Sequence, residues 1–334
     1  MKKTLLGLPL VLLIVLAALL VFTGSENLAF GDVWDALTGG GEETTAYFIV
    51  HHLRLPSLCT ALLAGFSLAA AGLVMQTLMG NPLADPSLLG VNAGAGLGAA
   101  LAVLLLGGSV TIGSLSVAGH VLTVVAAAIG AIAVTALLVA LSLRFRDNLR
   151  LLIAGVMVSF SVSSIVSIMG YFATAEGLQN YVFWGMGSFV GTTGESLLVF
   201  ALIVMPCLLI IVLCAQPLNG FLLGEDYARN LGIPVRRVRT LLLFVSGLLC
   251  GVTTAFCGPI GFIGLAAPHV ARLFHRSSDH RRLVPLTILW GGNLTLLSSV
   301  IARLPSGTAL PVGTVTPLLG VPVVFWLMTR RQRP

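Results

Sequence analysis

Charged side chains are scarce in this sequence. Asp, Glu, Lys and Arg make up 9% of its 334 residues, whereas hydrophobic residues make up 57%, and the mean hydropathy is +1.03. No stretch of the chain is long and polar enough to form a soluble domain. We therefore expect a single domain, residues 1–334, that lies in a membrane.

Motifs typical of nucleotide- and metal-dependent enzymes are also absent. The sequence has no G-x-x-x-x-G-K-[ST] loop, so we expect no ATP hydrolysis by that route. Its five cysteines show no C-x-x-C spacing and lie in apolar segments, which favours packing over metal or disulfide sites. His269 and His280 have no paired ligand spacing, and the adjacent His51 and His52 either touch a metal chelate or are simply solvated. The sequence therefore predicts no catalytic residue, no metal site and no cofactor in this chain.

Apolar runs of about 20 residues, long enough to cross a ~30 Å hydrocarbon core, recur along the chain. The first follows Lys2 and Lys3 and is either a signal peptide or a retained span. Its length and the lack of a small-x-small cleavage site favour a retained span. Pro268 and His269 interrupt the eighth run, which we expect to be short or broken. The predicted fold class is an all-α membrane protein with ten transmembrane helices, at 5–23, 56–78, 88–107, 117–141, 150–172, 195–214, 239–257, 262–275, 285–303 and 311–329.

Acidic residues are missing from the middle of these spans. Every Asp and Glu falls near a span boundary or in a loop. Ion-coupled carriers usually hold ionisable groups deep in the bilayer. This distribution counts against a secondary transporter and favours a pathway whose energy arrives from outside the membrane.

Basic residues are distributed unevenly about the ten spans. With the N-terminus inside, Arg54 and Arg303 are the only two of the 18 Lys and Arg residues in outer segments. Because basic loops remain in the cytoplasm, both termini and the loop 215–238 are predicted to be cytoplasmic. The concentration of basic residues on the cytoplasmic side explains the net charge of +6. Nucleic-acid binding is not needed to explain it, because such binding requires a clustered basic face on a folded surface.

The segment 218–239 is polar, unlike the apolar sequence around it. Glu225 and Asp226 follow a glycine and suit the positive end of a short helix, while Asn230 and Gly232 are typical stop signals. A proline two residues later can open the next helix. We expect a cytoplasmic hairpin on which another protein can push.

Two Gly/Pro-rich interruptions occur at comparable places, at 81–86 and 258–264. Irregular backbone at membrane depth persists only where protein or a water-filled cavity satisfies it. Spans 2–5 start outside and spans 7–10 start inside, so the interruptions fit an inverted repeat of these two four-helix units.

Three small-residue ridges lie among the 38 glycines. Such ridges allow helix backbones to approach closely, either within the chain or at a subunit interface. They are Gly90-x-x-x-Gly94-x-x-x-Gly98, Gly187-x-x-x-Gly191 and Gly247-x-x-x-Gly251.

Several segments resemble the FecCD-type permease family. They are RLPS at 54–57, GLVMQTLMGNPLADPSLLGVNAGAGLG at 72–98, LNGFLLGEDYARNLGIPVRRVR at 218–239, GPIGFIGLAAPHVARL at 258–273, DHRRLVPL at 279–286 and LPVGTVTPLLGVPVVFWLM at 310–328. The family supplies the membrane subunits of binding-protein-dependent ABC importers for iron–siderophore complexes, haem and cobalamin. The resemblance runs from about residue 50 to the C-terminus.

The resemblance implies the type II ABC importer permease architecture in the bacterial inner membrane. A second permease copy, or a homologous half, would complete a path along the dimer axis. Two ATPase subunits, which bind ATP and Mg, would lie below, and a periplasmic or lipid-anchored substrate-binding protein above.

The resemblance also assigns roles to residues. The hairpin would be the ATPase-coupling helix, with Gly224, Glu225, Asp226, Tyr227, Arg229, Asn230 and Gly232 as its residues. Arg54 and Arg303 would dock the binding protein, although snorkelling at helix ends is the alternative, and Ser57 stands where the family often has another arginine. The cytoplasmic gate would lie at Asn81, Leu83, Asn148 and Leu149, and the last two depart from the family's small hydroxylated residues.

Three functions are weighed on these grounds. An ABC importer permease is favoured, an ion-coupled secondary transporter of a small metabolite is the alternative, and an integral-membrane enzyme lacks a visible set of catalytic groups. An iron chelate is the expected cargo because it is the family's broadest use, with haem and cobalamin as the other candidates.

Overall fold

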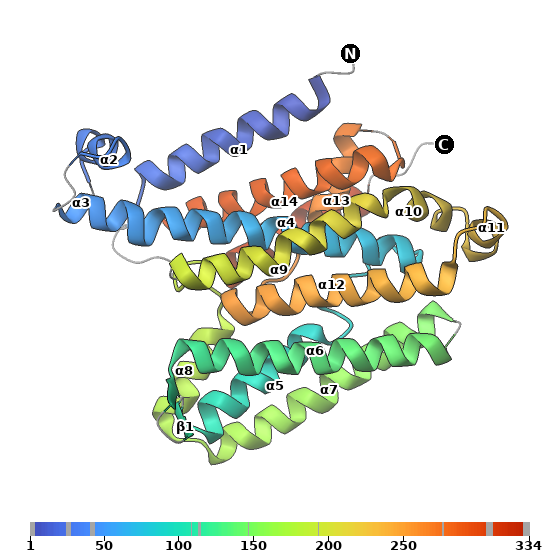
Figure 1. Ribbon diagram of the computed structural model, residues 1–334, viewed down its shortest axis with the longest axis horizontal. Helices are drawn as coiled ribbons and strands as arrows, with labels where there is room; N and C mark the ends of the chain where they lie inside the picture. The colour runs from blue at the N-terminus through green and yellow to red at the C-terminus, as the bar shows by residue number, and fades with distance from the viewer. Residues whose placement is uncertain are drawn as a thin grey trace.

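The structure is a computed structural model that describes residues 4–24, 28–40, 44–107, 109–112, 115–145, 147–192, 194–275, 277–304 and 310–329. Most of them are helical. The only strands among the described residues, β1 (Ser109–Ile112) and β2 (Leu115–Ala118), form a short antiparallel hairpin. The all-α prediction is confirmed apart from this hairpin, which lies at one end of the helical bundle (Figure 1).

Each of the ten predicted segments lies on a helix. Six helices in the described ranges are long and apolar enough to cross a membrane, and three more apolar helices are shorter. The eighth predicted segment forms a helix of 13 residues with Pro268 inside it, as expected. The ten helices are α1 (Thr4–Phe22), α4 (Leu55–Met79), α5 (Val91–Ala100), α6 (His120–Arg144), α7 (Asn148–Phe172), α9 (Gly194–Leu213), α12 (Val235–Cys257), α13 (Ile263–His275), α14 (His280–Ala302) and α15 (Val312–Thr329).

Short helices fill the connections. Most were not predicted, because they lack an apolar run long enough to stand out in the sequence. Two of them, α3 and the π-helix η1, lead directly into α4, while the π-helix η2 extends α5. Their bounds are α2 (Phe30–Leu37), α3 (Thr45–Phe48), η1 (Ile49–Arg54), η2 (Leu101–Leu105), α8 (Ala175–Gly185), α10 (Ala215–Phe221) and α11 (Glu225–Asn230).

The helix contacts repeat between two halves of the chain. Helix α4 packs on α13 and α14, and α12 packs in the same way on α5 and α6. Within each unit, α5 contacts α6 and α7, just as α13 contacts α14 and α15. Helices α4 and α12 contact each other between the units (Figure 1). This pattern of neighbours supports the predicted inverted repeat of spans 2–5 and 7–10.

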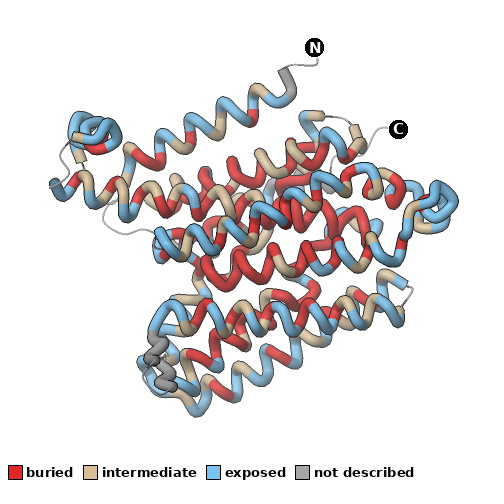
Figure 2. Tube along the Cα trace, in the orientation of Figure 1, coloured by how far each residue is buried: buried red, intermediate tan, exposed pale blue. Residues whose placement is uncertain are grey.

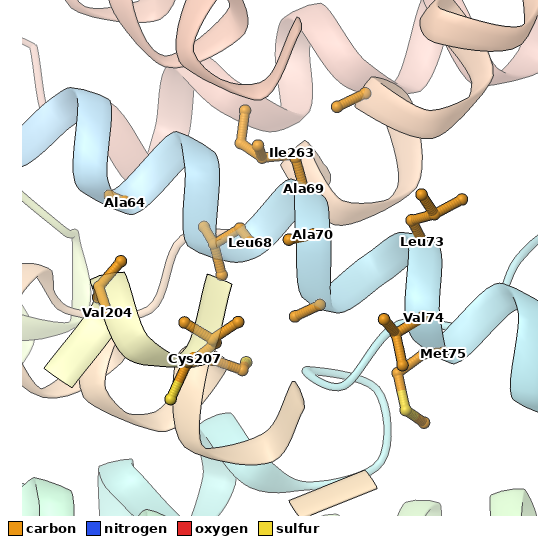
Figure 3. Packing of buried hydrophobic residues seen from close by; sticks show 14 of the residues in the cluster. Ala64, Leu68, Ala69, Ala70, Leu73, Val74, Met75, Val204, Cys207 and Ile263 are labelled. Carbon is orange, nitrogen blue, oxygen red and sulfur yellow. The ribbon is translucent and has the colours of Figure 1, made fainter. Parts of the chain in front are cut away.

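Small residues allow the central helices to approach closely. A methyl group on Gly72 of α4 would lie 2.1 Å from the carbonyl oxygen of Gly264 in α13. Figure 3 shows the small and aliphatic side chains of α4 packed between Ile263 of α13 and the α9 residues Val204 and Cys207. Gly94 and Gly247, which belong to two of the small-residue ridges, likewise lie against α6. These two ridges therefore serve packing within the chain.

Burial falls from the centre of the bundle outward. Helices α4 and α12 are buried along most of their length, whereas α7 and α9 are largely exposed (Figure 2). The two outer helices differ in chemistry. Beyond Glu195 and Gly194 at its start, the exposed face of α9 is apolar, while that of α7 combines large apolar side chains with Ser161, Ser164 and Ser167. Each of these serines donates a hydrogen bond to its own helix backbone.

The two interruptions meet inside the bundle. The first lies between Gly80 and Gly90, both of positive φ, and the second includes Phe262 at φ 69°. A methyl group on Gly264, the last residue of the second, would lie 2.1 Å from Oδ2 of Asp85 in the first. Asp85 is buried, and its burial raises the pKa of the carboxyl. The sequence correctly placed Asp85 in a loop, but tertiary packing has enclosed that loop.

The two ends of the bundle carry different short elements. The start of α1 lies toward the side that carries α10 and α11, whereas α2, α8 and β1 lie at the other end (Figure 1). The start of α1 and the hairpin thus share one side of the bundle. Some of the basic residues behind the predicted topology lie outside the described residues: Lys2, Lys3, Arg146, Arg276, Arg330, Arg331 and Arg333.

Candidate functional site

The polar hairpin forms a short exposed helix at one end of the bundle. Gly224, at φ 102°, precedes α11, and Gly232, at φ 79°, follows it. Positive φ is readily adopted only by glycine, so these residues permit the two reversals of the chain. Ala228 is fully buried and fixes one face of α11, while Leu223 and Tyr227 are exposed. The helix therefore presents a small, partly apolar surface.

Polar contacts hold the hairpin to the bundle. The side chain of Asn219 in α10 donates a hydrogen bond of 2.7 Å to Oδ1 of Asp279, and its own Oδ1 accepts one of 2.8 Å from the backbone of His280. Asp279 is also the N-cap of α14 and accepts a bond from the backbone of Arg281. The hairpin is thus anchored at the start of α14.

Four of the predicted coupling residues are exposed at the surface of α11: Asp226, Tyr227, Arg229 and Asn230. Asp226 and Arg229 form an ion pair of 3.0 Å, but both are exposed, so its contribution to stability is small. Glu225 differs from the prediction of an exposed contact residue. Its carboxylate accepts a hydrogen bond from the buried guanidinium of Arg239, because α11 packs against the start of α12 at this point.

Arg239 connects the hairpin to the predicted gate. Its Nη2 donates a hydrogen bond of 2.7 Å to Oδ1 of Asn148, the first residue of α7. The Nδ2 of Asn148 in turn donates to the carbonyl oxygen of Leu78 at the end of α4, at 3.1 Å. The two segments that were predicted to form the gate therefore lie together.

The remaining gate candidates sit on the surface of these segments. The backbone of Leu83 donates a 2.9 Å hydrogen bond to Oδ1 of Asn81, which closes a local turn. Asp147 receives a similar bond from the backbone of Leu149. Leu83 and Leu149 are both exposed, so each can contact another chain or solvent.

The two outer arginines converge on the end of α1. Arg54 is buried, and its Nη1 donates to the carbonyl oxygen of Val21 at 2.7 Å. Arg303 is half-buried and donates to the carbonyl oxygen of Leu20 at 2.9 Å. The same guanidinium reaches Ser57 at 3.3 Å. Burial and the neighbouring charge of Arg54 lower the pKa of Arg303.

The other candidate ligands are engaged in packing. His51 stacks on Tyr47 with ring centroids 4.2 Å apart, and His52 stacks on Phe48 at 4.7 Å. All five cysteines are free thiols. In the described part of the chain, no three His, Cys, Asp or Glu side chains are grouped to hold a metal ion.

The profile of the FecCD transport family matches residues 10–330. The chain belongs to the FecCD transport family. Membership makes it a transport permease subunit rather than an enzyme, and its apolar helices make it a multi-pass membrane protein.

Curated and solved relatives of this FecCD protein span almost its whole length. The vitamin B12 import system permease proteins BtuC of Salmonella paratyphi A and Salmonella typhi are each 42% identical over 329 residues, which cover 98% of this chain and 95% of the relative. A structure described as an inward-facing conformation of a putative metal-chelate type ABC transporter matches with a TM-score of 0.84 and 30% identity, and covers 98% of this chain and 99% of its own. PsaBC from Streptococcus pneumoniae, at 15% identity and a TM-score of 0.58, shares the fold.

Sequence reasoning did not single out Arg239 in this FecCD chain. We counted it with its neighbours Arg236 and Arg237 as one of several cytoplasmic charges, yet those two are exposed and Arg239 is buried. The spacing of residues does indicate that Arg239 is buried. It lies one helical turn from Val235 and from Leu242, on the same face of α12, and both of these residues are buried.

Proposed function

We propose that this chain forms the membrane path of an importer for a bulky metal chelate in the bacterial inner membrane. The observation that carries this proposal is the 42% identity to vitamin B12 import permeases over 98% of the chain. The likeness to a transporter described as metal-chelate type supports the same class of cargo. Cobalamin is therefore the first cargo to test, ahead of the ferric siderophore expected from the sequence and of haem.

Ligand binding by the cognate substrate-binding protein tests the cargo. We expect that protein to bind cyanocobalamin more tightly than haem or a ferric siderophore, and proteoliposomes with the full transporter to take up cyanocobalamin when ATP is supplied. If the binding protein instead binds a ferric siderophore most tightly, the cargo is the iron chelate that the sequence led us to expect. Uptake driven by an ion gradient without any ATPase would support a secondary transporter instead.

Ten crossings with both termini in the cytoplasm suit this function. Six apolar helices in the described ranges are long enough to cross a membrane, and the charged hairpin lies on the side where α1 begins (Figure 1). This topology directs α11 to the cytoplasm, where ATP is available. The outer arginines then lie on the side from which a binding protein approaches.

A second permease copy would cover α7. The exposed face of α7 carries more hydroxyl groups than that of α9, including Ser161, Ser164 and Ser167, whose oxygens can accept further hydrogen bonds besides the one that each donates to the backbone. A water-filled path between two copies would supply these bonds. The exposed Leu83 and Leu149 at the cytoplasmic end of the same region suit a gate closed by apolar contact.

Two ATPase subunits, which would supply the ATP and Mg sites, would each receive one α11. The exposed Tyr227, Leu223 and Leu231 suit an apolar cleft, and Asp226, Arg229 and Asn230 suit its polar rim. Co-purification tests this contact. Tyr227→Ala should lower the yield of a complex with the partner ATPase, whereas Leu202→Ala, which changes an exposed apolar residue of α9, should not. An equal yield from both variants would contradict the assignment of α11.

The docking surface for the binding protein would include Arg303. Arg303 is half-buried, so part of it remains available to a carboxylate of a partner. Arg54 would act beneath it, because it is buried against Val21. Ser57 also contributes by its contact with Arg303 rather than by a charge of its own.

A further inference from the structure

A buried charge joins three elements that are far apart in the sequence. The side chain of Arg239 is 8% exposed, and that of Glu225 is 35% exposed. One nitrogen of the guanidinium binds Glu225 in α11, and another binds Asn148 at the start of α7. Asn148 completes the connection by its bond to the carbonyl oxygen of Leu78 at the end of α4.

The geometry of the guanidinium makes this connection stiff. Its donors lie in one plane in a fixed fork, so the positions of the two acceptors are tied to each other. Separating a buried arginine from its partners leaves its charge without the counter-ion and the hydrogen-bond acceptor that stabilise it, which is strongly unfavourable. A displacement of Glu225 is therefore more easily accommodated by moving Asn148 than by breaking the connection.

Free space lies beside the connection. A cavity of about 900 Å³ is lined by Asn148, Glu225 and Arg239 together with Arg236 and Asp147. The groups are thus packed on one side and have room to shift on the other. A polar contact that moves as a unit must be stiff and must have space beside it. A contact that serves only stability is usually enclosed by close-packed side chains.

We propose that Arg239 is a positioning residue that transmits the displacement of α11 to the gate segments at Leu78 and Asn148. The inference rests on the proposed function, since it takes α11 as the element that the ATPase moves. It also gives Glu225 a different task from its neighbours on α11. Glu225 anchors the helix inward, while Tyr227 and Arg229 face the partner.

The ratio of cargo moved to ATP hydrolysed tests this inference. The complete transporter in proteoliposomes, with its ATPase and binding protein, is compared with Arg239→Gln. We expect the ratio to fall between about twofold and 30-fold, the range seen for residues that carry coupling between sites, while the complex still assembles. Arg237→Gln removes the same charge from an exposed position of the same helix and should keep the ratio of the unmodified protein.

A double-mutant cycle separates transmission from a structural role. If Asn148→Ala and Arg239→Gln act on one connection, the double variant should lower the ratio no further than the stronger single variant. Arg239→Lys, which keeps the charge but cannot hold both acceptors in a fixed fork, should give an intermediate ratio.

Three outcomes would overturn the inference. They are an unchanged ratio in Arg239→Gln, multiplicative effects in the double variant, and loss of assembly in Arg239→Lys and Asn148→Ala alike, since that loss would mean a structural contact. Failure of the unmodified chain to bind an ATPase, or to import with ATP, would instead contradict the proposed function.

Discussion

Arg54 and Arg303 bind consecutive carbonyl oxygens at the end of α1. Nη1 of Arg54 lies 2.7 Å from the oxygen of Val21, and Nη1 of Arg303 lies 2.9 Å from that of Leu20. The last carbonyl groups of a helix have no partner within the helix, and cations are favoured there. The two residues from distant helices, η1 and the end of α14, thus cap α1 together.

The two arginines should respond differently to removal. Arg54→Ala leaves a buried carbonyl without its charged donor, so we expect a loss of about 1.5–3 kcal/mol of stability. Arg303 is more exposed, and Arg303→Ala should instead weaken docking of the loaded binding protein with a smaller loss of stability. Thermal unfolding in detergent and the affinity for the binding protein measure the two effects. The assignment fails if Arg303→Ala leaves that affinity unchanged.

Gly72 should not tolerate a side chain. A methyl group there would lie 2.1 Å from the carbonyl oxygen of Gly264, and backbone cannot move aside as a flexible side chain does. We expect Gly72→Ala to destabilise the protein by about 1–3 kcal/mol through overpacking, measured as a lower midpoint of thermal unfolding. Gly7→Ala in α1 is the control, because nothing lies within 4 Å of its new methyl group. Equal midpoints for the two variants would contradict the close packing of α4 on α13.

Asp279 should stabilise the start of α14 in a pH-dependent way. Hydrogen bonds from Asn219 and from the backbone of Arg281 lower the pKa of its carboxyl. A lowered pKa means that the stabilisation is fully present above the ordinary carboxyl pKa of about 4 and is lost as the pH falls through the lowered value. Asp279→Ala should cost about 1 kcal/mol at neutral pH, as for other N-caps.

The same variant should lose less stability than the unmodified protein when the pH is lowered below about 4. Thermal unfolding at several pH values measures both effects. Asp35→Ala in α2 is the matched control, because Asp35 is exposed. A pH profile of Asp279→Ala identical to that of the unmodified protein would rule out this role.

The exposed face of α7 should be reached by water in the assembled transporter. In a chain without its native cysteines, Ser164→Cys should react with a membrane-impermeant maleimide during transport. Leu202→Cys on α9 should remain unreactive, because its surroundings are apolar and we expect them to be lipid. Equal reactivity at both positions would contradict a path along α7.

Much of the architecture could be predicted from the sequence because its causes are local. Runs of apolar residues set the positions of the ten helices, and Pro268 correctly indicated a short α13. Gly224, Asn230 and Gly232 marked the bounds of α11, since a positive φ or a helix stop depends on the residue itself. Helices such as α2 and α8 were not predicted, because a short helix at the edge of a bundle depends on what it packs against.

The environments of individual charged residues were decided by the tertiary structure. Arg236, Arg237 and Arg239 are alike as positive charges in the sequence, and counting them with the other charges predicts a cytoplasmic hairpin. Only the fold brings Asn148, 91 residues away, to Arg239, and only the fold encloses Asp85 beside Gly264. Hydropathy and charge act along the chain and can be read from it, whereas the partner of a buried polar group is set by which helices meet.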